Sequence, residues 1–186
     1  MTKEELRKTL RQRRNNLSAK DEKSHLITEH ILSFPPFQKA SVVMLYRSAK
    51  GEVDTEELWK KCRELGKTCV FPKCVSKTEM IAVVAEGEGD FSVCEFGILE
   101  PVSNQVFSKE KIDVIIVPAI GYDQKNFRMG YGGGYYDRYL EHFFGITVGL
   151  CYEELLEETV CPGEWDVPVN FVVTEHGVRP TSEESV

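Results

Sequence analysis

The chain has 186 residues, of which 41% are hydrophobic and 28% are charged, and its formal net charge is −7. These values predict one compact globular domain with a substantial core and exclude a disordered chain. The acidic balance also argues against a protein that binds nucleic acid through its general surface.

The chain shows no sign of a membrane or secreted protein. Its longest strongly apolar stretch, residues 112–120, contains Asp113 and Pro118 and is far shorter than the about 20 residues of a membrane span. No apolar segment follows the charged amino terminus, so no secretory signal is expected. The six cysteines form no CxxC pair, which disfavours a zinc site and favours free, mostly buried thiols. We therefore expect a cytoplasmic protein with no membrane partner.

The first predicted element is a helix over residues 3–16. At about 100° per residue, Lys3, Arg7 and Arg14 form a strip along the border of its apolar face. Such a strip is usually a solvated helix surface. However, residues 1–17 carry six basic side chains against two acidic ones, while the rest of the chain is acidic. This contrast favours contact with an anionic ligand.

Strands and helices alternate along the rest of the chain. Ser18 is predicted to cap a second helix that ends before Pro35, with an inner face of Leu26, Ile27, His30 and Ile31. The remaining predicted elements are a helix from residue 54 or 55 to 66, a helix over 135–144, and strands over 41–46, 68–72, 80–85, 113–120, 146–151 and 171–174.

This alternation predicts an α/β protein, a three-layer α/β/α sandwich with a mainly parallel sheet. We expect a single domain over residues 1–180 and a disordered tail over 181–186. In such sheets, ligands bind beyond the carboxyl ends of the strands. The loops after Tyr46 and Ile120 therefore lie on the candidate active face.

The main functional motif is the segment RMGYGGGYYD, from Arg128 to Asp137, between a predicted buried strand and a helix. Its four glycines let the backbone approach a ligand closely and adopt positive φ. Free N–H groups at the helix start favour an anion, and Arg128 offers a bidentate phosphate donor. A tight turn with a helix cap is the simpler interpretation, but this number of glycines beside Arg128 and Asp137 disfavours it.

The motif matches neither common nucleotide signature. It lacks the GxxxxGK[ST] pattern of a P-loop, and its glycines come too late after the strand for a dinucleotide fingerprint. Asp137 falls in the first turn of the predicted helix. Two roles remain open for it: complementing the helix dipole or holding Mg²⁺ beside a phosphate.

The segment RMGYGGGYYDRYL resembles the signature of the 5-formyltetrahydrofolate cyclo-ligases, also called methenyltetrahydrofolate synthetases. The similarity extends over nearly the whole chain, because other segments also occur in the family's order and spacing: KEELR, RQRRNNLS, GEVDTEEL, VIIVPAIGYD and WDVPV. The resemblance implies an enzyme that uses MgATP to convert 5-formyltetrahydrofolate into 5,10-methenyltetrahydrofolate, ADP and phosphate. An imidate phosphate intermediate, formed on the formyl oxygen, would suit this chemistry. We expect small-molecule partners only and a monomer.

The resemblance also implies roles for individual residues. ATP would be bound by Lys3, Glu4, Glu5, Leu6, Arg7, Arg128, Met129, Gly130, Tyr131, Gly132, Gly133, Gly134, Tyr135 and Tyr136. The folate would be contacted by Arg47, Glu52, Tyr131, Gly132, Gly133, Gly134 and Tyr135. Mg²⁺ would be held by Asp137 and Asp166, and the catalytic residues would be Arg128 and Asp137.

Some of these assignments depend on the resemblance alone. Glu52 would otherwise be an ordinary loop residue, and Asp166 a residue that caps or turns a loop. Gly133 stands where many relatives carry a lysine, so phosphate binding here is expected to depend more on backbone amides and on Arg128.

Two other hypotheses have different consequences. A non-catalytic module that senses a phosphorylated metabolite would bind its ligand without nucleotide turnover. A sugar-phosphate isomerase would need no ATP, and no acid–base pair of residues near the glycine loop supports it.

Overall fold

The computed structural model describes residues 1–95 and 97–180 of the chain. Its α-helices are α1 (Lys3–Asn16), α2 (Lys20–Leu32), α3 (Pro35–Lys39), α4 (Glu56–Glu64) and α5 (Tyr135–Leu140). Its strands are β1 (Val42–Met44), β2 (Thr68–Cys74), β3 (Met80–Val84), β4 (Phe91–Val93), β5 (Leu99–Pro101), β6 (Val114–Val117), β7 (Gly121–Asp123), β8 (Arg128–Met129), β9 (Ile146–Leu150), β10 (Leu156–Glu157), β11 (Phe171–Thr174) and β12 (Gly177–Pro180). The predicted disordered tail, 181–186, lies outside the described residues.

A seven-stranded sheet forms the centre of the molecule, in the order β12-β11-β9-β6-β1-β2-β3. The five inner strands are parallel to one another, and β3 and β12 add an antiparallel strand at each edge. All four residues of β6 are buried, as expected for a strand covered on both faces. The predicted α/β fold with a mainly parallel sheet is confirmed.

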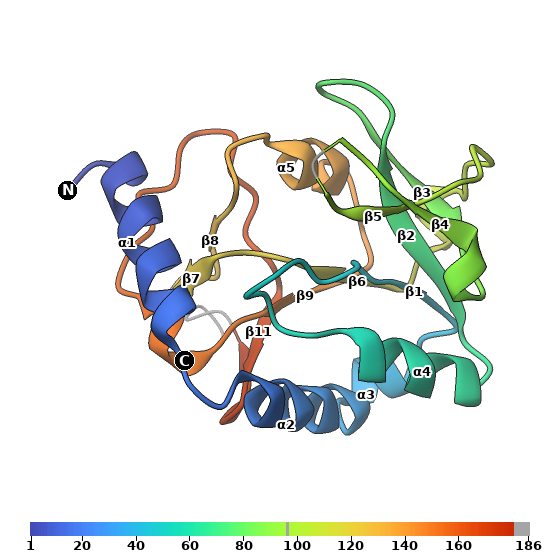
Figure 1. Cartoon of the computed structure of the whole chain (residues 1–186), viewed down its shortest axis with the longest axis horizontal. Helices are drawn as coiled ribbons and strands as arrows, with labels where there is room; N and C mark the ends of the chain where they lie inside the picture. The colour runs from blue at the N-terminus through green and yellow to red at the C-terminus, as the bar shows by residue number, and fades with distance from the viewer. Residues whose placement is uncertain (96, 181–186) are drawn as a thin grey trace.

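The two faces of this sheet are covered differently. Figure 1 shows α2, α3 and α4 side by side on one face, where α2 packs on β11 and α4 on β2. The opposite face carries α5 and the strands β4 and β5 (Figure 1). The third layer therefore consists of one short helix, small sheets and loops.

The chain direction reverses across the sheet between β1 and β6. From β1 the chain moves to β2 on one side, whereas β6, β9 and β11 follow on the other side. Such a switch point opens a crevice at the carboxyl ends of its two strands, where ligands of α/β proteins bind. The loops after β1 and β6, which the sequence placed on the active face, flank this point.

The start of α2 differs from the prediction. Ala19, with a φ of 54°, is the N-cap, and no side chain caps the helix, so Ser18 is not the cap. The buried face consists of Ser24, Ile27, Thr28 and Ile31, whereas Leu26 is exposed. The polar residues Ser24 and Thr28 are buried because α2 packs between the sheet and neighbouring loops, and Ser24 shares a hydrogen bond with the Tyr152 hydroxyl.

Several short strands were not predicted. β4 pairs with β5, and β7 forms a small sheet with β8 and β10. These strands have two or three residues each, too few to show an alternating pattern.

The six cysteines are free thiols, as predicted: Cys62, Cys69 and Cys151 are buried, Cys74 and Cys94 are partly buried, and Cys161 is exposed. Within residues 1–95 and 97–180, every helix is too short or too polar to span a lipid bilayer.

Candidate active site

The glycine loop, residues 130–134, connects β8 to α5 and lies against the loop that follows β1. Gly132 and Gly134 have φ values of +100° and +64°, a region that glycine enters without steric cost. The Tyr131 hydroxyl donates to Glu52 in the loop after β1. Arg7 Nε donates to the Gly130 carbonyl at 3.0 Å. The loop is therefore held between α1 and the switch point.

The helix after this loop is shorter than predicted, because α5 ends at Leu140 rather than at residue 144. Lys109 Nζ donates to the carbonyls of Tyr139 and Glu141, at 3.1 and 2.8 Å. His142 then adopts a φ of 56°, which turns the chain out of the helix. A helix of six residues has a small macrodipole. Any anion bound at this loop would therefore depend on individual N–H groups and on nearby cations.

The basic strip of α1 faces this region. Lys3 forms an ion pair with Asp166, and Arg14 Nη1 donates to the Tyr131 hydroxyl at 2.7 Å. With the contact of Arg7 to Gly130, all three side chains of the strip reach the glycine loop or the segment beside it. Their predicted contact with phosphate stays a prediction.

Other residues of the predicted ATP set have structural contacts. Glu5 forms a capping box with Thr2 at the start of α1, Glu4 pairs with Arg7, and Leu6 and Met129 are buried in the core. The sequence signal for the capping box is the T-x-x-E pattern of residues 2–5.

Arg128 is buried on β8 and joins two segments of the site. Its Nη2 lies 2.5 Å from Asp137 Oδ1, and its Nη1 donates to the Val167 carbonyl at 2.9 Å. Asp137 Oδ1 also accepts from the Val167 N–H at 3.0 Å. Because Arg128 already has these partners and its side chain is only 6% exposed, its placement does not favour the predicted role as a free phosphate donor.

Asp137 and Asp166 were predicted to hold Mg²⁺. The Val167 N–H bonded to Asp137 is adjacent to Asp166 in the chain, so both carboxylates belong to one part of the site. Asp166 Oδ2 pairs with Lys3 and accepts from the Gly163 N–H at 2.9 Å. Burial alone would raise the pKa of Asp166, but the hydrogen bonds from Lys3 and Gly163 outweigh it and lower that pKa.

This pair of carboxylates fits a magnesium ion. In the part of the chain that the structure describes, Asp137 Oδ2 and Asp166 Oδ1 accept no hydrogen bond. Mg²⁺ is commonly held by one or two carboxylates together with substrate phosphates. Lys3 would have to share Asp166 with the ion.

Glu52 lies opposite Tyr131 in the loop after β1. Its Oε2 accepts from the Ala49 N–H at 2.7 Å, and its Oε1 accepts from the Tyr131 hydroxyl. Burial raises the pKa of Glu52, although these hydrogen bonds and the charge of Arg14 oppose the rise. The predicted pair of folate contacts, Glu52 and Tyr131, is therefore brought together in space.

Arg47, the other predicted folate contact, has different partners. Its guanidinium lies 4.8 Å from the ring centroids of both Trp59 and Phe91. It also forms ion pairs with Glu56 and Glu88, at 3.2 and 3.0 Å. Aromatic rings and carboxylates already contact this guanidinium. For Arg47 to bind folate, one of these contacts would have to break.

Two tyrosine hydroxyl groups near Glu52, those of Tyr46 and Tyr152, were not predicted. Tyr46 donates to the Val53 carbonyl at 3.0 Å, and Tyr152 donates to the Glu52 carbonyl at 3.1 Å. The Tyr136 hydroxyl is buried and has no hydrogen-bond partner among the described residues. No local pattern could have identified Tyr46 and Tyr152 as neighbours of Glu52, because they follow the separate strands β1 and β9.

Arg138 was also missed, although it follows the glycine motif directly. Its Nη2 donates to the Gly133 carbonyl and its Nε to the Thr78 carbonyl, each at 2.6 Å. The Tyr135 hydroxyl donates to the Ser76 carbonyl at 3.0 Å. These bonds attach the glycine loop to the turn between β2 and β3, about sixty residues away in the chain.

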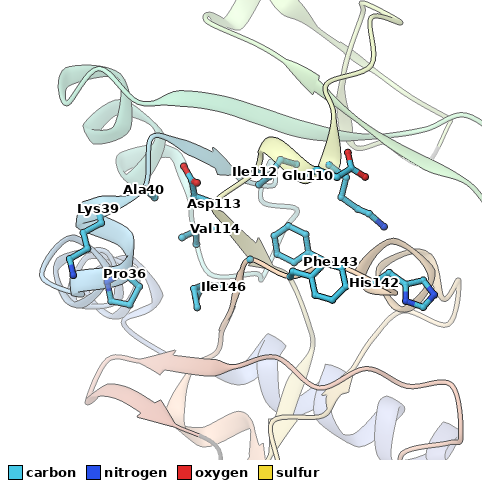
Figure 2. Close-up of a pocket in the computed structure, with 13 residues that line it drawn as sticks. Pro36, Lys39, Ala40, Glu110, Ile112, Asp113, Val114, His142, Phe143 and Ile146 are labelled. Atoms are coloured by element: carbon cyan, nitrogen blue, oxygen red, sulfur yellow. The ribbon is translucent and has the colours of Figure 1, made fainter.

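A hollow of about 450 Å³ lies at the opposite edge of the sheet. It is lined by residues at the amino ends of β6 and β9, including Val114 and Ile146 (Figure 2). Figure 2 shows Phe143 and Asp113 in its wall. The Asp113 carboxylate accepts hydrogen bonds from the N–H groups of residues 41 and 42. We place the candidate site at the switch point because charged and hydrogen-bonding groups converge there.

A further group with metal-ligand chemistry lies on exposed parts of α2 and α4, where His25, Glu29 and Glu57 approach one another. His25 Nδ1 lies 2.9 Å from Glu57 Oε2. The hydrogen bond and charge of Glu57 raise the pKa of His25. The cluster is an exposed ion pair of a kind that needs no metal.

The similarity to known proteins extends over almost the whole chain. The family model of the 5-formyltetrahydrofolate cyclo-ligase family matches residues 1–175. A 5-formyltetrahydrofolate cyclo-ligase of Escherichia coli K12 is 29% identical over 174 residues, which cover 89% of this chain and 96% of the relative. The corresponding protein of Mycoplasma pneumoniae is 28% identical over 182 residues, with 94% and 99% coverage.

Two solved structures are similar in fold. The structure of a 5,10-methenyltetrahydrofolate synthetase from Aquifex aeolicus has a TM-score of 0.87 and 34% sequence identity, and the match covers 100% of this chain and 96% of that one. The structure of the Mycoplasma pneumoniae synthetase has a TM-score of 0.77 and 25% identity, with 94% and 99% coverage.

Proposed function

The chain belongs to the 5-formyltetrahydrofolate cyclo-ligase family, and from this premise we propose that it uses MgATP to convert 5-formyltetrahydrofolate into 5,10-methenyltetrahydrofolate, ADP and phosphate. The observation that carries the proposal is the closeness, at the switch point, of the residues proposed to bind ATP (the ATP half-site) and those proposed to bind folate (the folate half-site). The glycine loop, with the cations of α1, faces Glu52 in the loop after β1. With phosphate on the glycine loop and the pterin ring on Glu52, as we propose, the two substrates would lie side by side.

The reaction needs activation of a formamide, because its oxygen is a poor leaving group. We propose that the formyl oxygen attacks the γ-phosphorus of ATP and that ADP departs, which leaves an imidate phosphate. N10 of the folate then attacks the formyl carbon, the carbon–oxygen bond breaks, and inorganic phosphate leaves with the N10 proton. The formyl oxygen therefore ends in the phosphate product.

The protein's main task in such a transfer is to position the reactants and neutralise charge. The N–H groups of the glycine loop and the side chains of Lys3 and Arg7 would hold the ATP phosphates. Mg²⁺, held by Asp137 and Asp166, would neutralise charge on these phosphates. Glu52 would accept hydrogen bonds from the N–H donors of the pterin ring.

Purified protein, incubated with 5-formyltetrahydrofolate and MgATP, tests this proposal. We expect the absorbance of the methenyl product to appear with one ADP per product, and we expect chelation of Mg²⁺ to stop both. With a heavy oxygen isotope in the formyl group, mass spectrometry should find the label in the released phosphate.

The alternatives predict other results. Binding of ATP or folate by folded protein, without ADP or methenyl product, would support a sensor and contradict the proposed reaction. Product formation with the label absent from phosphate would exclude the imidate phosphate route.

A further inference from the structure

Arg14 is an unusual buried cation. Only 8% of its surface is exposed, and buried guanidinium groups are normally paired with carboxylates. None of the ion pairs formed by residues 1–95 and 97–180 includes Arg14. Its Nε is buried without a hydrogen-bond partner among them, and its Nη1 donates to the Tyr131 hydroxyl at 2.7 Å. Among the described residues, the one hydrogen bond of the Arg14 side chain is therefore to Tyr131.

The contact with Arg14 fixes the direction of the next hydrogen bond. A guanidinium is only a donor, so the Tyr131 oxygen must accept from Arg14. The single hydrogen of the phenol is then free to point at Glu52 Oε1, where the structure has a hydrogen bond. Tyr131 lies on a glycine-rich loop, and without Arg14 its oxygen would lose the donor that fixes the orientation of the hydroxyl.

Glu52 is thereby held from two sides. Its second carboxylate oxygen accepts from the Ala49 N–H. Gly51, with a φ of +90°, lies close enough to Arg14 that a Cβ there would be 3.2 Å from Arg14 Nε. The arginine thus packs against the backbone beside Glu52 as well as acting through Tyr131.

We infer that Arg14 is a positioning residue for folate: through the Tyr131 hydroxyl it orients Glu52 to receive the N–H donors of the pterin ring. This inference rests on the proposed function. It assigns Arg14 an effect on the folate half-site and none on the ATP half-site, although Arg14 lies on the same basic strip of α1 as Lys3 and Arg7.

Glu52 is the group of this cluster that titrates in the acid range. The burial that raises its pKa is opposed by Tyr131, by the Ala49 N–H and by Arg14. The other titratable groups that face it are phenols, and burial raises the pKa of each beyond its ordinary basic value, so all stay neutral in acid: Tyr46, Tyr122, Tyr131, Tyr136 and Tyr152. Removal of the Arg14 cation should therefore raise the pKa of Glu52 further.

The variant Arg14→Gln tests the inference in steady-state kinetics. We expect KM for 5-formyltetrahydrofolate to rise roughly tenfold and KM for ATP to change less than about twofold. The acid limb of kcat/KM for folate should move to higher pH by about one unit, because Glu52 must be ionised to bind. Arg14→Lys keeps the positive charge and should leave the acid limb close to its position in the parent protein.

The matched control is Arg13→Gln, the neighbouring arginine, which pairs with Glu157 on the surface and should leave both KM values and the acid limb unchanged. If Arg14→Gln does not fold, Tyr131→Phe removes the hydroxyl that carries the effect and should move the acid limb in the same direction. An acid limb that stays in place in the folded Arg14→Gln protein, or in Tyr131→Phe, overturns the inference. Parent protein without cyclo-ligase turnover contradicts the proposed function instead.

Discussion

Tyr136 contains a buried hydroxyl that no described residue satisfies. Leaving such a group unpaired costs about 1–3 kcal/mol, so its presence requires an explanation. Burial raises the pKa of Tyr136 well above its ordinary value, and the charge of Glu52 adds to the rise. The hydroxyl is therefore a neutral group near the candidate folate contact, and we expect a substrate atom to become its partner.

The variant Tyr136→Phe should separate stability from activity. We expect its free energy of unfolding, measured by urea denaturation, not to fall and to rise by up to about 1–3 kcal/mol, because no hydrogen bond is lost and an unpaired buried hydroxyl is removed. Turnover should fall by up to about tenfold. Tyr46→Phe is the control: it deprives the buried Val53 carbonyl of its donor and should cost about 1–3 kcal/mol. Equal destabilisation by both changes would show that the Tyr136 hydroxyl has a structural partner.

Gly133 has a steric reason to be glycine in this chain. A Cβ at this position would lie 2.8 Å from the Tyr135 ring, closer than side-chain carbons approach. A lysine at position 133 would therefore require Tyr135 to move away from Ser76. Arg138 brings a cation to the same place, since its guanidinium bonds to the Gly133 carbonyl.

At the scale of elements, β8 and α5 are joined by the ion pair between Arg128 and Asp137. The same arginine reaches the backbone of Val167, so one buried side chain connects three segments of the site. From the sequence, removal of Arg128 would be expected to weaken phosphate binding. With these contacts, we expect its removal to disrupt the structure around the glycine loop instead.

Arg128→Ala should therefore destabilise the protein. Breaking a buried ion pair by removing one partner costs about 3–5 kcal/mol, since Asp137 would be left without its counter-charge. Urea denaturation measures the loss. Arg13→Ala, which removes an exposed ion pair with Glu157, should cost less than about 1 kcal/mol. A stable Arg128→Ala protein whose only change is a higher KM for ATP would restore the role in phosphate binding.

At the scale of the whole molecule, the candidate site consists of segments that are distant in the chain. The pair Lys3–Asp166 spans 163 residues, and the pair Glu52–Tyr131 spans 79. A ligand that bridges α1, the loop after β1 and the glycine loop would therefore tie the two ends of the domain together.

Ligand binding should accordingly raise the melting temperature. At a concentration of 100 times Kd, a ligand adds about 2.7 kcal/mol to the stability. For a domain of this size, that increment corresponds to a rise of roughly 5–11 °C. Differential scanning fluorimetry with MgATP and with 5-formyltetrahydrofolate measures it. A rise with sugar phosphates, and none with these two ligands, would favour the isomerase hypothesis.

The sequence by itself determined the fold class, the main strands and the family. Apolar runs such as the one in β6 encode burial locally, and the glycine motif is a short contiguous signal. The same local information located the glycine loop and the basic strip of α1. It could not reveal partners, because a hydrogen bond such as that between Tyr131 and Glu52 depends on how distant segments pack.

Only the tertiary structure decided what each charged side chain contacts. Arg128, read from the sequence as a phosphate donor, is buried against Asp137, and the guanidinium of Arg47 lies 4.8 Å from the ring centroids of Trp59 and Phe91. Arg14, which the sequence could place only on a basic strip, lies against Tyr131 beside Glu52. The physical reason is that a guanidinium reaches any acceptor within several ångströms of its helix or strand, and packing alone selects which acceptor is there.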